Sequence, residues 1–155
     1  GRIQDAFGPA IRKKLARYDV EVLGQSILDD QADAIAAEIN AYLEKGADMI
    51  LCTGGMSVDP DDTTPTAIQK SGAEIISYGA PVLPGAMFLL AYQDDIPIMG
   101  LPGCVMYAKQ TVFDLVLPRV MAGEKLTRAD LAQYGEGGLC LNCPECTFPN
   151  CGFGK

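Results

Sequence analysis

Two glycines followed by oxygen-bearing side chains form the part of the sequence best suited to bind an anion, in TGGMSVDPDDTTP. A short apolar run at 49–52 precedes the glycines and is typical of a buried parallel strand. Gly54 and Gly55 allow the backbone to approach a ligand and to expose its N–H groups, and the helix expected next adds partial positive charge. Because ligands bind at the carboxyl ends of strands in open α/β sheets, the stretch predicts a phosphate site.

Hydroxyl and carboxylate side chains crowd the positions after these glycines. They are Ser57, Asp59, Asp61, Asp62, Thr63 and Thr64. Hydroxyls can hydrogen-bond phosphate oxygens, and carboxylates beside a phosphate require a cation between them, which predicts Mg²⁺. The same residues also suit an ordinary strand-to-helix turn, in which Asp62 or Thr63 is the helix N-cap and the other acids are solvated.

Four of the six cysteines lie close together in CLNCPECTFPNC, near the end of the sequence. They are Cys140, Cys143, Cys146 and Cys151. This spacing, in a chain without histidine, suits a Cys₄ zinc site, and its CxxCxxC part also suits ferredoxin-type iron–sulfur ligation. The remaining alternative is a reduced, flexible or disulfide-forming tail that holds no metal.

Length and composition predict one α/β domain followed by a short tail. The chain has 155 residues, of which 48% are hydrophobic, enough for a single core at 1–134, whereas 135–155 is rich in Gly, Pro and Cys. The formal charge of −8 argues against a nucleic-acid or anionic-membrane partner. No apolar run has the length of a membrane span and no secretory signal opens the sequence, so we expect a cytoplasmic protein.

Periodicity predicts alternating helices and strands. Helices are expected at 9–18, 30–45 with Asp30 as its cap, 64–71, and 104–123 with a bend at Pro118. Strands are expected at 19–24, 49–52 and 74–79, with an antiparallel pair within 87–100. This order predicts a mostly parallel sheet with helices on both faces.

The glycine turn and three further motifs together resemble the molybdopterin-binding domain family of molybdopterin adenylyltransferases, molybdenum insertases and gephyrin. In that family a Gly-Gly turn is followed seven residues later by an aspartate and then by a threonine, and Gly55, Asp62 and Thr64 have this spacing. GRIQD at 1–5, ILDD at 27–30 and LPG at 101–103 are similar to other family motifs and occur in family order.

The resemblance implies a molybdopterin-binding-domain-like fold, which is a three-layer α/β/α structure, and self-association into trimers or dimers. It implies a small-molecule pterin ligand, molybdopterin or the molybdenum cofactor, whose phosphate is held at the glycine turn with Mg²⁺ near Asp62. The implied catalytic carboxylates are Asp62 and Asp30. The implied cofactor-binding residues are Asp5, Thr53, Gly54, Gly55, Ser57, Thr64, Pro102 and Gly103.

Departures from the family pattern favour binding over turnover. Insertases usually have Lys-Pro at the positions of Ala86 and Met87 in this chain. They usually have Asn-Pro at the positions of Cys104 and Val105. Cys104 itself is either a small buried residue or a thiolate whose pKa a helix dipole lowers. The resemblance places the family's first strand before residue 1, so we expect the chain to be a fragment of a longer protein.

The family resemblance suggests two hypotheses of function, and relatives of the same fold suggest a third. The first is a binding module in cofactor biosynthesis, insertion or delivery, whose partner is a molybdoenzyme or other domains of the longer protein. The second is an Mg²⁺-dependent insertase or adenylyltransferase. The alternative is an Mg²⁺-dependent nucleotide pyrophosphatase of the competence-damage-related type, which TGG and PDD also resemble.

Overall fold

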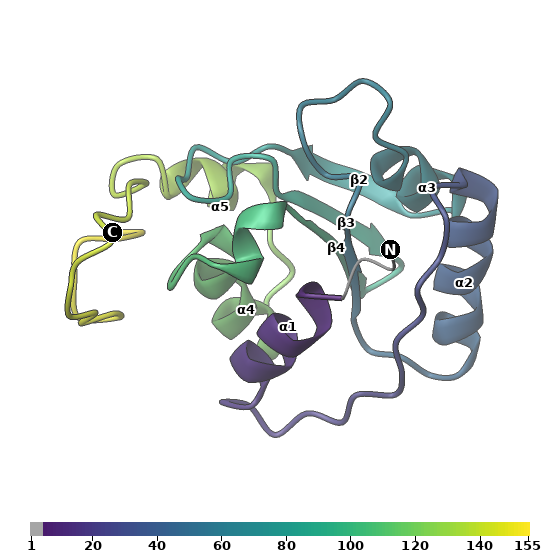
Figure 1. The fold of residues 1–155 in the computed structure, drawn as a ribbon, viewed down its shortest axis with the longest axis horizontal. Coiled ribbons are helices and arrows are strands. Elements are labelled where there is room, and N and C mark those ends of the chain that lie inside the picture. The colour runs from purple at the N-terminus through teal and green to yellow at the C-terminus, as the bar shows by residue number, and fades with distance from the viewer. Residues whose placement is uncertain (1–4) are drawn as a thin grey trace.

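The computed structural model describes residues 5–155, so the first four residues of the GRIQD motif lie outside it. In chain order the elements are α1 (Phe7–Leu15), α2 (Ala32–Glu44), β1 (Ile50–Thr53), α3 (Thr64–Lys70), β2 (Glu74–Tyr78), β3 (Leu89–Gln93), β4 (Ile96–Leu101), the 3₁₀ turn η1 (Gly103–Met106), α4 (Val112–Met121) and α5 (Arg128–Gln133). They form an α/β fold, as the sequence predicts (Figure 1).

A four-stranded mixed sheet lies at the centre, in the strand order β1-β4-β3-β2. β1 is parallel to β4, whereas β3 is antiparallel to both β4 and β2. The prediction of a mostly parallel sheet is therefore wrong, and the predicted antiparallel pair within 87–100 is confirmed. The physical reason is the two-residue turn Asp94–Asp95 between β3 and β4, because a parallel crossover needs a much longer connection.

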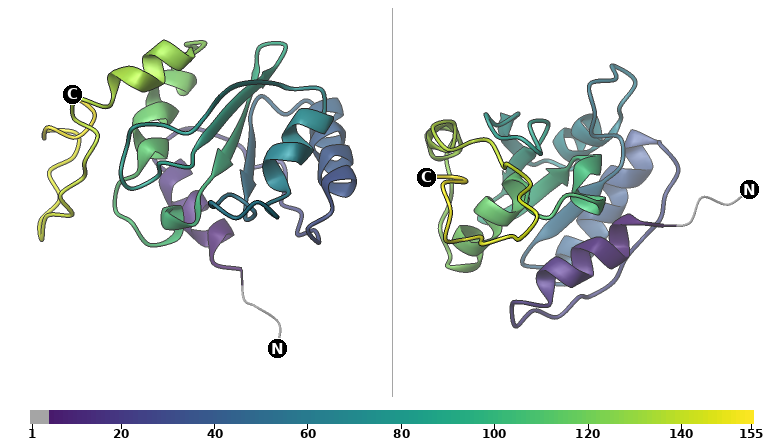
Figure 2. Two further views of the ribbon diagram at one scale, coloured as in Figure 1. Left: turned by 90° about the horizontal axis from the view of Figure 1, so that it is seen from above. Right: turned by 60° about the vertical axis from the view of Figure 1, so that its left-hand side comes forward.

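Hydrophobic residues pack on both faces of the sheet, because successive side chains of a strand point to opposite faces. Leu89 of β3 belongs to a cluster with Ile39 of α2 and Ile68 of α3. Leu90, the next residue, belongs to a second cluster with Phe113 of α4 and residues of α1 and α5. Figures 1 and 2 show α2 and α3 on one side of the sheet and α1 and α4 on the other.

The strand predicted at 19–24 does not form, and the segment has no regular secondary structure. A strand needs a neighbour to accept and donate its ladder hydrogen bonds, and this segment has none among residues 5–155. It lines a cavity of about 1050 Å³ together with β1, an edge strand of the sheet. Val22 and Leu23 consequently stay partly exposed, at 40% and 49%.

The single helix predicted at 104–123 is two elements, η1 and α4. Thr111 interrupts it, because its extended backbone and its side chain form a capping box that starts a new helix at Val112. Pro118 lies inside α4 without ending it. The cap predicted for α2 is also wrong, since Gln31 rather than Asp30 occupies the N-cap position.

Residues 5–155 include no helix with both the length and the apolar character needed to cross a membrane.

An ion pair joins α1 to α4. Lys14 Nζ lies 2.7 Å from Asp114 Oδ2, and the two side chains are nearly buried, with 13% and 9% exposure. The same carboxylate oxygen accepts a hydrogen bond from the Thr111 N–H at 2.8 Å, which is part of the capping box. Asp114 therefore supports both the start of α4 and the packing of α1 against it.

Replacing Asp114 with asparagine should lower the free energy of unfolding by about 3 kcal/mol, because Lys14 would remain as a nearly buried charge without its partner. The matched control is Asp33→Asn, which removes a pair of the same 2.7 Å length between exposed side chains, Lys70 and Asp33. That control should cost less than about 1 kcal/mol. Urea unfolding measures both changes, and two equally small losses would contradict the role given to Asp114.

Candidate anion-binding site at the glycine turn

The pairing of β1 with β4 places two predicted motifs at one end of the sheet. The strands are parallel, and Thr53 lies opposite Leu101 in the register. The TGG motif continues from Thr53 and the LPG motif continues from Leu101. The loops that begin at Gly54 and Pro102 are therefore neighbours at the carboxyl ends of adjacent strands, where open α/β sheets bind ligands.

Both glycines of the turn have the left-handed backbone conformation that favours glycine, with φ of 78° at Gly54 and 54° at Gly55. A Cβ on Gly55 would lie 2.9 Å from Thr64 Oγ1, so this position is also closely packed. A Cβ on Gly54 would meet no described atom within 4 Å. Gly55 is thus the packed side of the turn, and Gly54 is its open side.

Thr64 fixes the turn from the start of α3. Its hydroxyl donates a hydrogen bond to the carbonyl oxygen of Gly54 at 2.7 Å, and the residue is only 3% exposed. Because this bond uses the hydroxyl proton, the Thr64 side chain stabilises the backbone of the turn in this structure.

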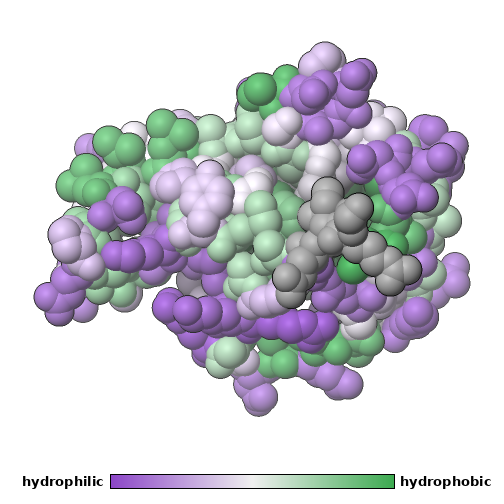
Figure 3. Space-filling model, in the orientation of Figure 1, coloured by the Kyte–Doolittle hydropathy of each residue, from purple (hydrophilic) through white to green (hydrophobic). Residues whose placement is uncertain are grey.

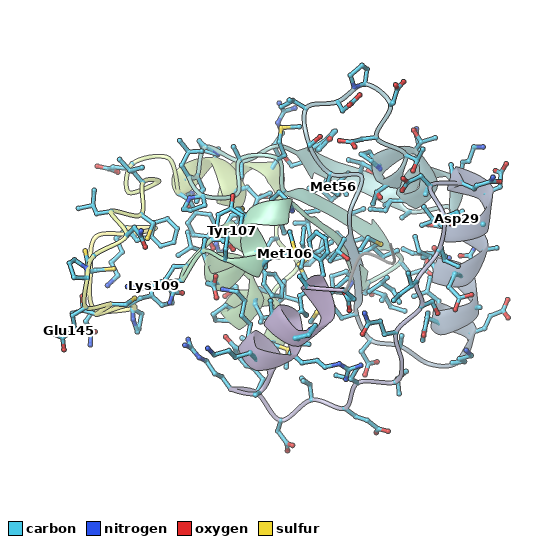
Figure 4. The ribbon with its side chains drawn as sticks, viewed as in Figure 1. Asp29, Met56, Met106, Tyr107, Lys109 and Glu145 are labelled. Carbon is cyan, nitrogen blue, oxygen red and sulfur yellow. The ribbon has the colours of Figure 1, made fainter. Side chains whose placement is uncertain are left out.

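Several polar atoms beside the turn have no partner within residues 5–155. The amide N–H groups of Gly55 and Met56 donate to no acceptor there, and the hydroxyl oxygen of Thr63 is buried without a hydrogen bond. Met56, labelled in Figure 4, packs against β4, where a Cβ on Gly100 would lie 2.8 Å from its sulfur. Unsatisfied N–H and O–H groups beside an open glycine turn are what an anion would satisfy.

Asp62 closes the loop that follows the turn. Its Oδ2 accepts hydrogen bonds from the backbone N–H of Ser57 and from the Ser57 hydroxyl, the second at 2.8 Å. This loop is the hydrophilic projection at the top of Figure 3. Ser57 and Asp62 therefore lie side by side.

Tyr78, at the end of β2, is a neighbour of this loop that the sequence did not reveal. Its hydroxyl donates to the carbonyl oxygen of Ser57 at 3.3 Å. Burial raises the pKa of the Tyr78 hydroxyl, and the nearby Asp62 carboxylate acts in the same direction. No local pattern marks Tyr78, because its contact with the loop depends on the sheet order.

The three aspartates of the loop do not gather into a metal cage. Asp59 Oδ1 accepts from the Asp61 N–H at 3.0 Å, which is a local turn contact. Among residues 5–155, no three His, Cys, Asp or Glu side chains lie close enough together to hold one metal ion.

The cavity of about 1050 Å³ reaches one edge of this region. Its long lining includes three predicted residues, Asp30, Thr53 and Thr64. Asp62, Pro102 and Gly103 are not part of that lining. Asp30 itself is exposed, which leaves its carboxylate accessible.

Asp5 accepts hydrogen bonds from the backbone at the start of α1. Its carboxylate accepts hydrogen bonds from the Gly8 N–H at 3.2 Å, the Phe7 N–H at 2.9 Å and Gln25 Nε2 at 2.7 Å. The bonds from Gln25 and then from the Gly8 amide lower the pKa of Asp5. Gln25, which also lines the cavity, is a second neighbour without a sequence signal.

The structure favours the interpretation of Cys104 as a small, partly buried residue over the thiolate interpretation. Cys104 lies in η1, a single 3₁₀ turn, and not at the start of a long helix. Burial raises the pKa of the Cys104 thiol, and the nearby Asp114 carboxylate adds to this effect. For Cys52, within β1, burial raises the pKa of the thiol to about 12.

Comparison with known proteins agrees with the motifs. Residues 1–122 match the family described as "Probable molybdopterin binding domain". The molybdopterin molybdenumtransferase of Synechococcus elongatus is 24% identical over 133 residues, which are 84% of this chain and 33% of the relative. A CinA-like protein of Mycobacterium avium is 32% identical over 77 residues, 49% of this chain and 18% of the relative. The chain thus spans a third or less of these relatives.

The fold also resembles that of a solved structure. The molybdopterin biosynthesis enzyme MoaB of Thermus thermophilus superposes with a TM-score of 0.60 at 23% identity, covering 79% of this chain and 87% of that one. This likeness supports the α/β fold. Since the family match covers residues 1–122, well over half of the sequence, the chain belongs to the molybdopterin-binding domain family.

Proposed function

We propose that this domain binds molybdopterin or the molybdenum cofactor and acts in the biosynthesis, insertion or delivery of that cofactor. The single observation that carries the proposal is the turn at Gly54–Gly55, where an open left-handed glycine lies beside two backbone amides that have no partner within residues 5–155. A phosphate oxygen can accept from such amides, and each hydrogen bond to a charged oxygen contributes about 1.5–3 kcal/mol. The family match supports a pterin as the rest of the ligand.

The residues around the turn divide into ligand contacts and positioning residues. In the proposal, the Gly54–Gly55 backbone and the Ser57 hydroxyl contact the phosphate, with Thr53, Asp30, Pro102 and Gly103 around the remainder of the ligand. Thr64 and Asp5 are positioning residues, because their polar atoms hold the turn and the start of α1. A Mg²⁺ ion near Asp62 would screen the phosphate charge and polarise its oxygens.

Two further parts of the proposal concern architecture and assembly. The hydrophobic clusters on the two sheet faces support the three-layer arrangement of the family. The proposal also includes self-association into a trimer or dimer and a molybdoenzyme that receives the cofactor. It further includes a cytoplasmic location and a tail at 135–155 that binds metal. Light scattering coupled to gel filtration measures the oligomeric state directly.

A second candidate function is hydrolysis of a nucleotide pyrophosphate. The observation that favours it is the 32% identity with a CinA-like protein, which is higher than the 24% identity with the molybdenumtransferase, although over fewer residues. The same turn and Asp62 would then bind a diphosphate with a divalent ion.

Gly54→Ala should weaken molybdopterin binding at least about tenfold, because the added methyl group enters the open side of the turn and removes about one charged hydrogen bond. The matched control is Gly72→Ala. Gly72 is also left-handed, with φ of 100°, and its Cβ would also meet no described atom within 4 Å. Both variants should lose about 1 kcal/mol of stability from backbone strain.

Anaerobic equilibrium dialysis against molybdopterin measures the affinity of each variant, and thermal unfolding measures its stability. Equal affinity of Gly54→Ala and Gly72→Ala would remove the glycine turn from the ligand site. Failure of the unchanged protein to retain molybdopterin at all would overturn the proposed function.

Asp62→Asn should abolish any Mg²⁺-dependent turnover while keeping the loop folded, because an amide oxygen can still accept from Ser57 but binds Mg²⁺ weakly. The control is Asp61→Asn, one residue away and exposed, which should retain activity. Release of AMP from adenylylated molybdopterin, started by molybdate, tests the insertase reading. Hydrolysis of ADP-ribose with Mg²⁺ tests the pyrophosphatase reading, and binding without either activity identifies a binding module.

A further inference from the structure

The C-terminal tail is anchored to the domain, so its cysteines have defined positions. Leu83 N–H donates to the Gly138 carbonyl at 2.7 Å, and Cys140 N–H donates back to the Leu83 carbonyl at 2.8 Å. Phe153 is 4% exposed and joins the core cluster that contains α4. Its ring lies 6.2 Å from that of Phe148, which packs against the same cluster. In Figure 1 the tail covers the end of the molecule beyond α5.

All four tail cysteines line one cavity of about 260 Å³. They are Cys140, Cys143, Cys146 and Cys151, and none of them forms a disulfide. Phe148 and Phe153 contribute apolar wall, whereas Lys109 and Gln110 contribute polar groups from the loop before α4. The cavity is therefore lined by residues from two distant parts of the sequence.

All four thiols line this one space. No three of the cysteine, aspartate or glutamate side chains in residues 5–155 are close enough to share a single metal ion. A zinc ion needs all four sulfurs about 2.3 Å from one centre. In a [4Fe–4S] cluster each cysteine binds a different iron, so the sulfurs stand farther apart around a larger body. A cavity of about 260 Å³ lined by all four thiols is larger than a single zinc ion needs and has room for such a cluster.

The polar groups at the cavity suit a negatively charged cluster. Lys109 Nζ donates to the carbonyl oxygens of Cys143 and Pro144 at 2.9 and 3.2 Å, which brings an ammonium group to the cysteine loop (Figure 4). Gln110 Nε2 lies 3.7 Å from Cys146 Sγ, and Gln110 is 6% exposed. Hydrogen bonds to sulfur and a nearby positive charge stabilise cluster-bound thiolates.

We propose that the tail binds a [4Fe–4S] cluster through Cys140, Cys143, Cys146 and Cys151. In loading from a preformed cluster that carries four small thiolate ligands, each cysteine thiol forms one Fe–S bond. The displaced small thiolate takes the cysteine's proton and leaves as a free thiol, so no electron is gained or lost. This site shares no lining residue with the glycine turn, so the proposal does not rest on pterin binding.

The test mixes the metal-free chain anaerobically with a synthetic [4Fe–4S] cluster bearing small thiolate ligands, then removes unbound cluster by gel filtration. About four irons and about four sulfides per chain should remain, with a broad visible absorbance that dithionite bleaches. One tightly bound zinc ion that blocks loading, or four thiols that still titrate after incubation, would overturn the proposal.

Variants locate the cluster on the tail. Cys143→Ser and Cys146→Ser should each lower the retained iron at least about twofold, because each removes one of four ligands. Cys104→Ser is the matched control, since Cys104 does not line the cavity, and it should retain the full iron content. Loss of iron in all three variants alike would also overturn the proposal. Gly54→Ala should keep the cluster, which separates this result from failure of the pterin site.

Discussion

The parallel pairing of β1 with β4 is the interaction on which the candidate ligand site depends. Thr53 lies opposite Leu101, so the two loops that carry the family motifs leave the sheet side by side. β4 can occupy this position because it also pairs with β3 through a two-residue turn. β4 is buried on both faces, since Ile98 and Met99 have 0% exposure. This burial fixes the ends of these loops within the core.

The acidic character of the chain decides how an anion can be held. With a formal charge of −8, the protein repels a phosphate over most of its surface, and no lysine or arginine occurs from Thr53 to Ile68. Backbone amides at left-handed glycines attract an anion without a charged side chain. A cation bound at Asp62 would add to this attraction, so the binding is expected to depend on divalent ions.

The glycine turn and the cysteine tail use different means to position reactive groups. At the turn, the packed Gly55 and the Thr64 hydroxyl hold the backbone in a conformation that glycine favours. In the tail, two aromatic rings and the Lys109 contact to the cysteine loop hold a segment that has almost no regular structure. The first site depends on the sheet, and the second depends on contacts between the tail and the loop before α4.

The sequence by itself determined what depends on neighbours along the chain: the helix at 64–70, the antiparallel pair at 87–100, the glycine turn, the cysteine spacing and the family motifs. Only the tertiary structure decided the mixed direction of the sheet, the absence of a strand at 19–24, the hydrogen bond from Gln25 to Asp5 and the cavity that the four thiols line. The reason is physical. Turns and helices form their hydrogen bonds within a few residues, whereas a ladder, a buried ion pair or a cavity wall needs a partner from a distant part of the chain.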